Sequence, residues 1–73
     1  MKKCKKDRLA IGDKVSYKPD YYQPNNCEHG IVKSIPMHIK DSVFVVYNCA
    51  GRWGEYKEYT AALTNVNDLY KGW

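Results

Sequence analysis

The most apolar segment of this 73-residue chain is Ser42-Val43-Phe44-Val45-Val46-Tyr47. Its residues are mainly β-branched or aromatic, which favours an extended strand. Apolar side chains stand on both alternating sets of positions, so we expect this strand to be central in a sheet and covered on both faces. The residues that follow, Asn48-Cys49-Ala50-Gly51-Arg52, have the small and polar side chains of a reversal.

Two further strands are predicted before this segment. Gly12-Asp13 introduces Lys14-Val15-Ser16-Tyr17-Lys18, in which polar and apolar residues alternate as in a half-buried strand. Pro19 ends this strand because it lacks a backbone N–H. Residues 30–35 form the second predicted strand, which Pro36 ends in the same way.

The segment after residue 52 carries two competing patterns. Trp53, Tyr56 and Tyr59 recur every three residues, which fits a helical turn. The β-favouring residues among 55–60, and the need of the preceding strand for a hairpin partner, favour a strand over 55–60, which we expect. Residues 61–65 then form a short last strand or a turn. Asn67 is expected to cap a single turn through Lys71 that stops at Gly72.

Four or five short strands within about 60 residues predict an all-β fold. An open flat sheet of this size would leave its edges unpaired and one face uncovered, and curling into a small barrel removes both problems. The chain has room for one domain. We therefore expect a flexible basic arm over residues 1–8, followed by a β-barrel domain over residues 9–73 with a short C-terminal turn.

The strand pattern resembles a known group of folds. Gly12-Asp13-Lys14-Val15, Gly30-Ile31-Val32 and the run Val43–Tyr47 look like the opening three strands of small SH3-like barrels of the Tudor and KOW kind. In such barrels a Gly-Asp pair starts the first strand, and a glycine admits close packing in the second. The closing stretch from Tyr59 to Trp73 is similar to short uncharacterised proteins of bacteria and their phages, which implies such an origin.

The net charge of +4 is concentrated at one end of the chain. Residues 1–8 carry five basic side chains and one acidic one, and the remaining 65 residues carry seven of each. A basic binding face on the folded body is therefore not evident from the charge count. The basic side chains of the arm are Lys2, Lys3, Lys5, Lys6 and Arg8.

The cysteines and the apolar runs indicate a cytoplasmic protein without a membrane interaction. Cys4, Cys27 and Cys49 are odd in number and widely spaced, which favours free thiols over a disulfide framework. No apolar stretch long enough for a signal peptide follows the basic start. The longest apolar run, Val43–Tyr47, is far shorter than the roughly 20 residues of a membrane span.

Neither a metal site nor catalysis is predicted. Cys27, His29, His38 and Cys49 have side chains that zinc accepts, but they form no C-x-x-C or H-x-x-x-H pair. Cys27 and His29 are two residues apart, which on a strand only puts them on one face. No third group is evident that would activate the thiol. We expect no cofactor, no metal and no enzymatic activity.

The aromatic residues suggest the leading function. Seven tyrosines, two tryptophans and one phenylalanine are a large number for this length, and most of them are expected to pack in the core and hairpins. Trp53, beside two glycines, is expected to be the most exposed ring. Because aromatic residues are favoured at interface centres, where charge is depleted, we expect a protein or peptide partner to bind around Tyr22, Tyr47, Trp53 and Tyr56.

Nucleic-acid binding is the alternative function. The cations of the arm can contact phosphates, and exposed aromatic residues such as Tyr21, Tyr22 or Trp53 can stack on unpaired bases. A solubility role of the arm, and a structural role in an oligomer, are further interpretations that the sequence leaves open. We expect a monomer or a weak homo-oligomer.

Overall fold

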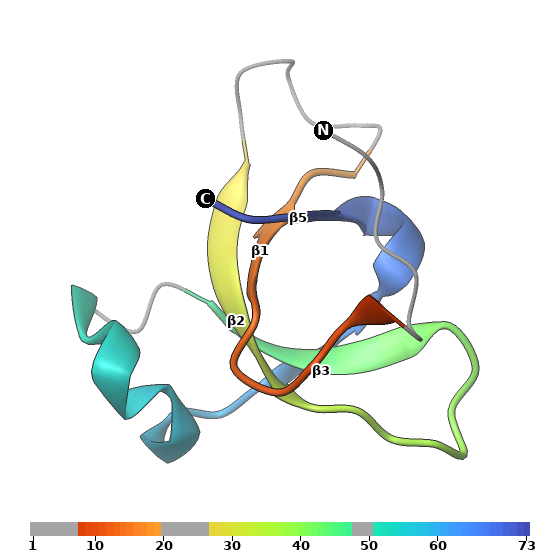
Figure 1. Ribbon diagram of the computed structural model, residues 1–73, viewed down its shortest axis with the longest axis horizontal. Helices are drawn as coiled ribbons and strands as arrows, with labels where there is room; N and C mark the ends of the chain where they lie inside the picture. Colours follow the sequence, from red (N-terminus) through yellow and green to blue (C-terminus); the bar gives the residue numbers. More distant parts are fainter. Residues whose placement is uncertain (1–7, 20–26, 48–50) are drawn as a thin grey trace.

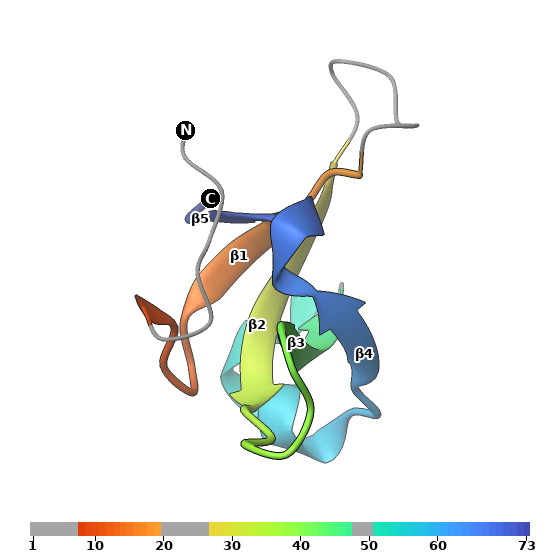
Figure 2. The ribbon, with the colours of Figure 1, turned by 90° about the vertical axis from the view of Figure 1, so that its right-hand side faces the viewer.

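A computed structural model describes residues 8–19, 27–47 and 51–73. The described part is a single antiparallel sheet with the strand order β4-β3-β2-β1-β5. Figures 1 and 2 show the strands curling around a common centre, so the sheet forms a partial barrel. The predicted all-β, barrel-like fold is confirmed. The strands are β1 (Lys14–Tyr17), β2 (Glu28–Ser34), β3 (Ser42–Tyr47), β4 (Ala62–Asn65) and β5 (Leu69–Lys71).

Strand β3 is the predicted apolar segment, and it has neighbours on both edges. It pairs with β2 on one side and with β4 on the other. Val43 and Val45 are completely buried on one face, and Val46, on the opposite face, is only 1% exposed. The expectation that this strand lies inside the sheet is confirmed, although β2 holds the middle position and Phe44, on the same face as Val46, is only half-buried.

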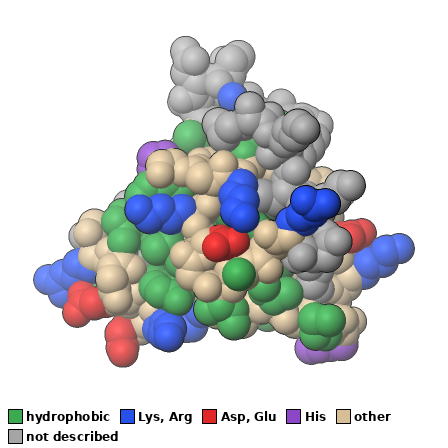
Figure 3. Space-filling model, viewed as in Figure 1, with side chains coloured by type: hydrophobic (Ala, Val, Ile, Leu, Met, Phe, Trp, Pro, Cys, Tyr) green, Lys and Arg blue, Asp and Glu red, His purple; other side chains and the backbone are tan. Residues whose placement is uncertain are grey.

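The core lies on the concave side of the sheet and consists mainly of valine and leucine. The β-branched side chains come from alternate positions of β1, β2 and β3, as the two-residue period of a strand requires. On the surface, hydrophobic, basic and acidic side chains are interspersed over the face seen in Figure 3. The buried core residues are Leu9, Val15, Val32, Val43, Val45, Val66 and Leu69.

The predicted strand over residues 55–60 is wrong, because this region is a 3-10 helix. Helix η3 spans Trp53–Glu58 and packs against β2. A 3-10 helix has three residues per turn, so residues three apart lie on the same side. Trp53, Tyr56 and Tyr59 are half-buried while the residues between them are exposed, which matches this geometry. The three-residue aromatic period was therefore the better guide to this segment.

The C-terminal region also differs from the expected turn. Helix η4 (Val66–Asp68) comes first, and the side chain of Asn65, rather than Asn67, accepts a hydrogen bond from the backbone at its start. Leu69 then begins strand β5, which pairs with β1. Leu69 is completely buried, and burying it requires an extended segment laid along β1. Of the two alternatives for residues 61–65, a short last strand or a turn, the strand is correct: it is β4, although β5 follows it.

Gly30 is the point of closest approach between β2 and β3. A Cβ atom on Gly30 would lie 2.5 Å from Cγ1 of Val45 and 3.1 Å from Cδ1 of Tyr47. Real side chains do not approach a Cβ so closely, so only glycine allows this packing. The sequence-based expectation of a glycine that admits close packing in the second strand matches this contact.

Replacing Gly30 with alanine is expected to destabilise the fold. The added methyl group must displace Val45 or Tyr47, and overpacking of this kind costs about 1–3 kcal/mol. Gly54→Ala is the matched control, because nothing lies within 4 Å of a Cβ at that position. Urea unfolding followed by circular dichroism measures both variants. Equal midpoints for the two would contradict the close approach at Gly30.

Candidate functional site

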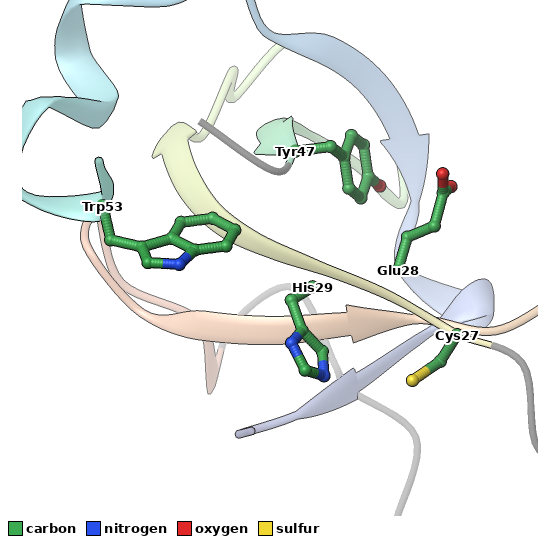
Figure 4. Close-up of a pocket in the computed structure, with 5 residues that line it drawn as sticks. All are labelled: Cys27, Glu28, His29, Tyr47 and Trp53. Carbon is green, nitrogen blue, oxygen red and sulfur yellow. The ribbon is translucent and has the colours of Figure 1, made fainter. Parts of the chain in front are cut away.

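Two neighbouring hollows lie beside the ends of β1 and β3 and the start of β2. The first, the Trp53 hollow, has a volume of about 310 Å³. Figure 4 shows the rings of Trp53 and Tyr47 coming from different elements, with the β2 ribbon passing between them in this view. The described residues that line it are Cys27, Glu28, His29, Tyr47 and Trp53.

The second hollow, the Tyr17 hollow, has a volume of about 440 Å³. It shares Glu28 and Tyr47 with the Trp53 hollow, so these two side chains form the boundary between them. The described residues that line it are Tyr17, Glu28, Tyr47, Ala62, Leu63, Thr64, Asn65 and Asp68.

The strand register brings the shared side chains together. Tyr17 pairs with Glu28 across β1 and β2, and Tyr47 pairs with Gly30 across β2 and β3. Directly paired residues point to the same face of a sheet, and residues two apart on a strand share a face. Tyr17, Glu28 and Tyr47 therefore stand side by side on the concave face, at one end of the partial barrel.

The Tyr47 ring is held in place by two contacts. Its hydroxyl lies 2.7 Å from Oγ1 of Thr64, and the Thr64 hydroxyl donates to the carbonyl oxygen of Ala62 at 3.2 Å. Because the Thr64 proton is directed to Ala62, the Tyr47 hydroxyl is the donor to Thr64. The rings of Tyr17 and Tyr47 also meet edge to face at 5.7 Å. The wall between the two hollows is thus preorganised.

The described walls of the hollows combine aromatic rings with acidic groups. Glu28 lies between the hollows and Asp68 lines the Tyr17 hollow, while no Lys or Arg is among the described lining residues. Carboxylates and the negative faces of aromatic rings both favour a positively charged ligand group. Chemically, this arrangement can bind a cationic or amphipathic group.

The residues of the predicted aromatic site are only partly brought together. Tyr47 and Trp53 line the same hollow. Tyr56 lines neither hollow among the described residues, and its hydroxyl lies by Gly12, before β1. The expectation that Trp53 is the most exposed ring is wrong, because Trp53 is half-buried against Trp73, whose ring centroid lies 4.6 Å away, whereas Trp73 is 38% exposed. Tyr22 lies outside the described residues.

Of the predicted basic arm, residues 1–8, the structure describes only Arg8. Arg8 is exposed, and Lys2, Lys3, Lys5 and Lys6 lie outside the described residues. Sequence reasoning did not assign Glu28, Tyr17 or Trp73 to a site. The pairing of Glu28 with Tyr17 follows from the strand register, and Trp73 is isolated near the end of the sequence, so no motif marks either of them.

Cys27 and His29, two of the side chains considered for zinc, both line the Trp53 hollow. Over residues 8–19, 27–47 and 51–73, no group of three or more His, Cys, Asp or Glu side chains is arranged to hold a metal ion. Cys49, the other cysteine considered, lies outside these ranges. None of the helices in these ranges is both long enough and apolar enough to cross a membrane.

Comparisons with known proteins leave the site as the main guide to function. No protein-family model matches the chain. No similar protein was found among the curated proteins or among the solved structures.

The hydrogen bond between Tyr47 and Thr64 is expected to contribute measurably to stability. In a double-mutant cycle of Tyr47→Phe and Thr64→Val, we expect a coupling of about 0.5–1.5 kcal/mol, the usual net value of such a bond. Urea unfolding of the four proteins measures it. Strictly additive effects of the two substitutions would show that the two hydroxyl groups do not interact.

Proposed function

We propose that this protein is a non-catalytic interaction module that binds a segment of a protein or peptide along the two hollows around Tyr47. The observation that carries this proposal is the pair of adjoining hollows separated by Glu28 and Tyr47. Neighbouring hollows suit successive side chains of an extended peptide. Tyrosine and tryptophan are the residue types that most often anchor such interfaces.

The charge of the hollows supports a basic peptide segment as the ligand. Glu28 and Asp68 contribute negative charge, and complementary charge increases both the association rate and the specificity of binding. Tyr47 is fixed by Thr64 and Tyr17, so its side chain loses little freedom when a ligand binds.

We also propose that the partial barrel is related to SH3-like barrels of the Tudor and KOW kind, from a bacterium or phage, and acts in the cytoplasm as a monomer or weak homo-oligomer. The Gly12-Asp13 start of β1, the close packing at Gly30 and the Val/Tyr-rich β3 support the relationship. The odd number of widely spaced cysteines supports the location.

A displayed library of random peptides tests the proposed function. We expect the wild-type protein to select peptides rich in Lys and Arg. Trp53→Ala is expected to weaken the best peptide about thirtyfold, because truncating an aromatic anchor costs about 2 kcal/mol or more. Ala62→Lys introduces a cation into the Tyr17 hollow, because Ala62 is exposed and pairs with Val45 on the concave face, and it should also weaken binding. Isothermal titration calorimetry measures each affinity.

Met37→Lys is the matched control for Ala62→Lys. Met37 is 90% exposed, lines neither hollow, and gains the same charge when it is replaced. We expect the Met37→Lys variant to bind the selected peptide with an affinity within about twofold of that of the wild type, because isolated surface substitutions have small effects. If no peptide is selected, or if Ala62→Lys and Met37→Lys behave alike and Trp53→Ala binds normally, the proposed function is wrong.

A further inference from the structure

A second aromatic cluster lies on the outer side of β1 and β2. The rings of His29 and Trp73 are stacked, with centroids 4.9 Å apart and planes at 5°. Trp53, the first residue of η3, contacts Trp73 at 4.6 Å. The ammonium group of Lys14 lies 4.6 Å from the centroid of the Trp73 ring. Two tryptophans, one histidine and one cation thus form a continuous group.

The Trp73 ring is anchored by backbone and side-chain hydrogen bonds. Its indole N–H donates to the carbonyl oxygen of Gly30 at 2.9 Å. Gly72, directly before it, donates its N–H to the carbonyl oxygen of Lys14 at 2.7 Å and accepts from the Ser16 hydroxyl at 2.8 Å. Trp73 nevertheless remains 38% exposed. His29 covers one face of this ring and the Lys14 ammonium group lies over it, so a base stacks on the part of the ring that these side chains leave open.

Cations adjoin this aromatic cluster around the start of β1. Lys71 lies on β5, its ammonium group is 3.6 Å from the Asp13 carboxylate, and it donates to the carbonyl oxygen of Arg8 at 3.4 Å. Asp13 directly precedes Lys14. Figure 3 shows Lys and Arg side chains with an acidic side chain near them on the face that it displays.

The charge of this region remains positive after its ion pair is counted. Arg8, Lys14 and Lys71 supply three positive charges and Asp13 removes one. The sequence places four further lysines, Lys2, Lys3, Lys5 and Lys6, in the residues directly before Arg8.

We propose that the surface formed by Arg8, Lys14, His29, Trp53, Lys71 and Trp73, the Trp73 surface, binds single-stranded nucleic acid. Unpaired bases stack on its rings, and the cations contact the phosphates. Stacking needs the exposed face of a base, which duplexes do not offer, so single strands fit this surface better than duplexes. This inference goes beyond the proposed function, because it assigns a different class of ligand to a surface that shares only His29 and Trp53 with the hollows.

Fluorescence anisotropy with labelled ten-nucleotide oligo(dT), oligo(U) and a ten-base-pair duplex tests the proposal. We expect both single strands to bind more tightly than the duplex, with an affinity that falls steeply as salt rises. Stacking of a base on tryptophan should also quench the intrinsic fluorescence of the protein, which phosphate contacts alone would not do.

Two substitutions separate stacking from simple charge attraction. Trp73→Ala is expected to weaken single-strand binding at least fivefold, because one base loses its stacking partner. Lys14→Gln should weaken it and reduce the salt dependence, whereas Lys40→Gln, an exposed lysine in the connection between β2 and β3, is the matched control and should leave both unchanged. Circular dichroism confirms the fold of each variant.

Several results would overturn the proposal. Equal binding of the duplex and the single strands would do so, as would equal effects of Lys14→Gln and Lys40→Gln. If binding is lost only when residues 2–6 are deleted, and polyglutamate competes for it, the ligand is attracted by charge alone and the Trp73 surface takes no part. The peptide affinities of Ala62→Lys and Met37→Lys are independent of all these results.

Discussion

The close approach of β2 and β3 at Gly30 is the constraint on which both surfaces depend. Because Gly30 has no side chain, Val45 and Tyr47 pack directly over its backbone. The carbonyl oxygen of Gly30 also accepts the hydrogen bond from the Trp73 indole N–H. The ring that separates the two hollows and the ring at the centre of the outer cluster are therefore positioned by the same residue. A side chain at this position would move Tyr47 directly and disturb Trp73 through the backbone.

The two surfaces differ in charge although they share two residues. Glu28 and Asp68 make the hollows acidic, and Arg8, Lys14 and Lys71 make the outer surface basic. His29 and Trp53 line the Trp53 hollow, and the rings of both also contact the ring of Trp73. The balanced charge of residues 9–73 thus conceals an uneven distribution, which a count of charged residues cannot reveal.

The sequence predicted the elements that local pattern determines. Strand β3 is apolar on both faces and β1 alternates, so both were found. Strand β5 was missed because its three residues, Leu69–Lys71, have no alternation of their own and become a strand only by pairing with β1. Helix η3 was mistaken for a strand because tyrosine and threonine favour strands, while the three-residue spacing of its aromatic residues is a weaker local signal.

The candidate site was predictable only where composition pointed to it. Tyr47 and Trp53 stand out as aromatic residues near turns, and they do line one hollow. Glu28 was not predicted as a site residue, because a single glutamate in the sequence does not indicate that it pairs with Tyr17 on the neighbouring strand. Trp73 was not assigned for a related reason: His29, Trp53 and Lys14 reach it from three separate elements. Binding surfaces that form across strands depend on pairing register, so in a small barrel their residues follow from the fold rather than from any motif.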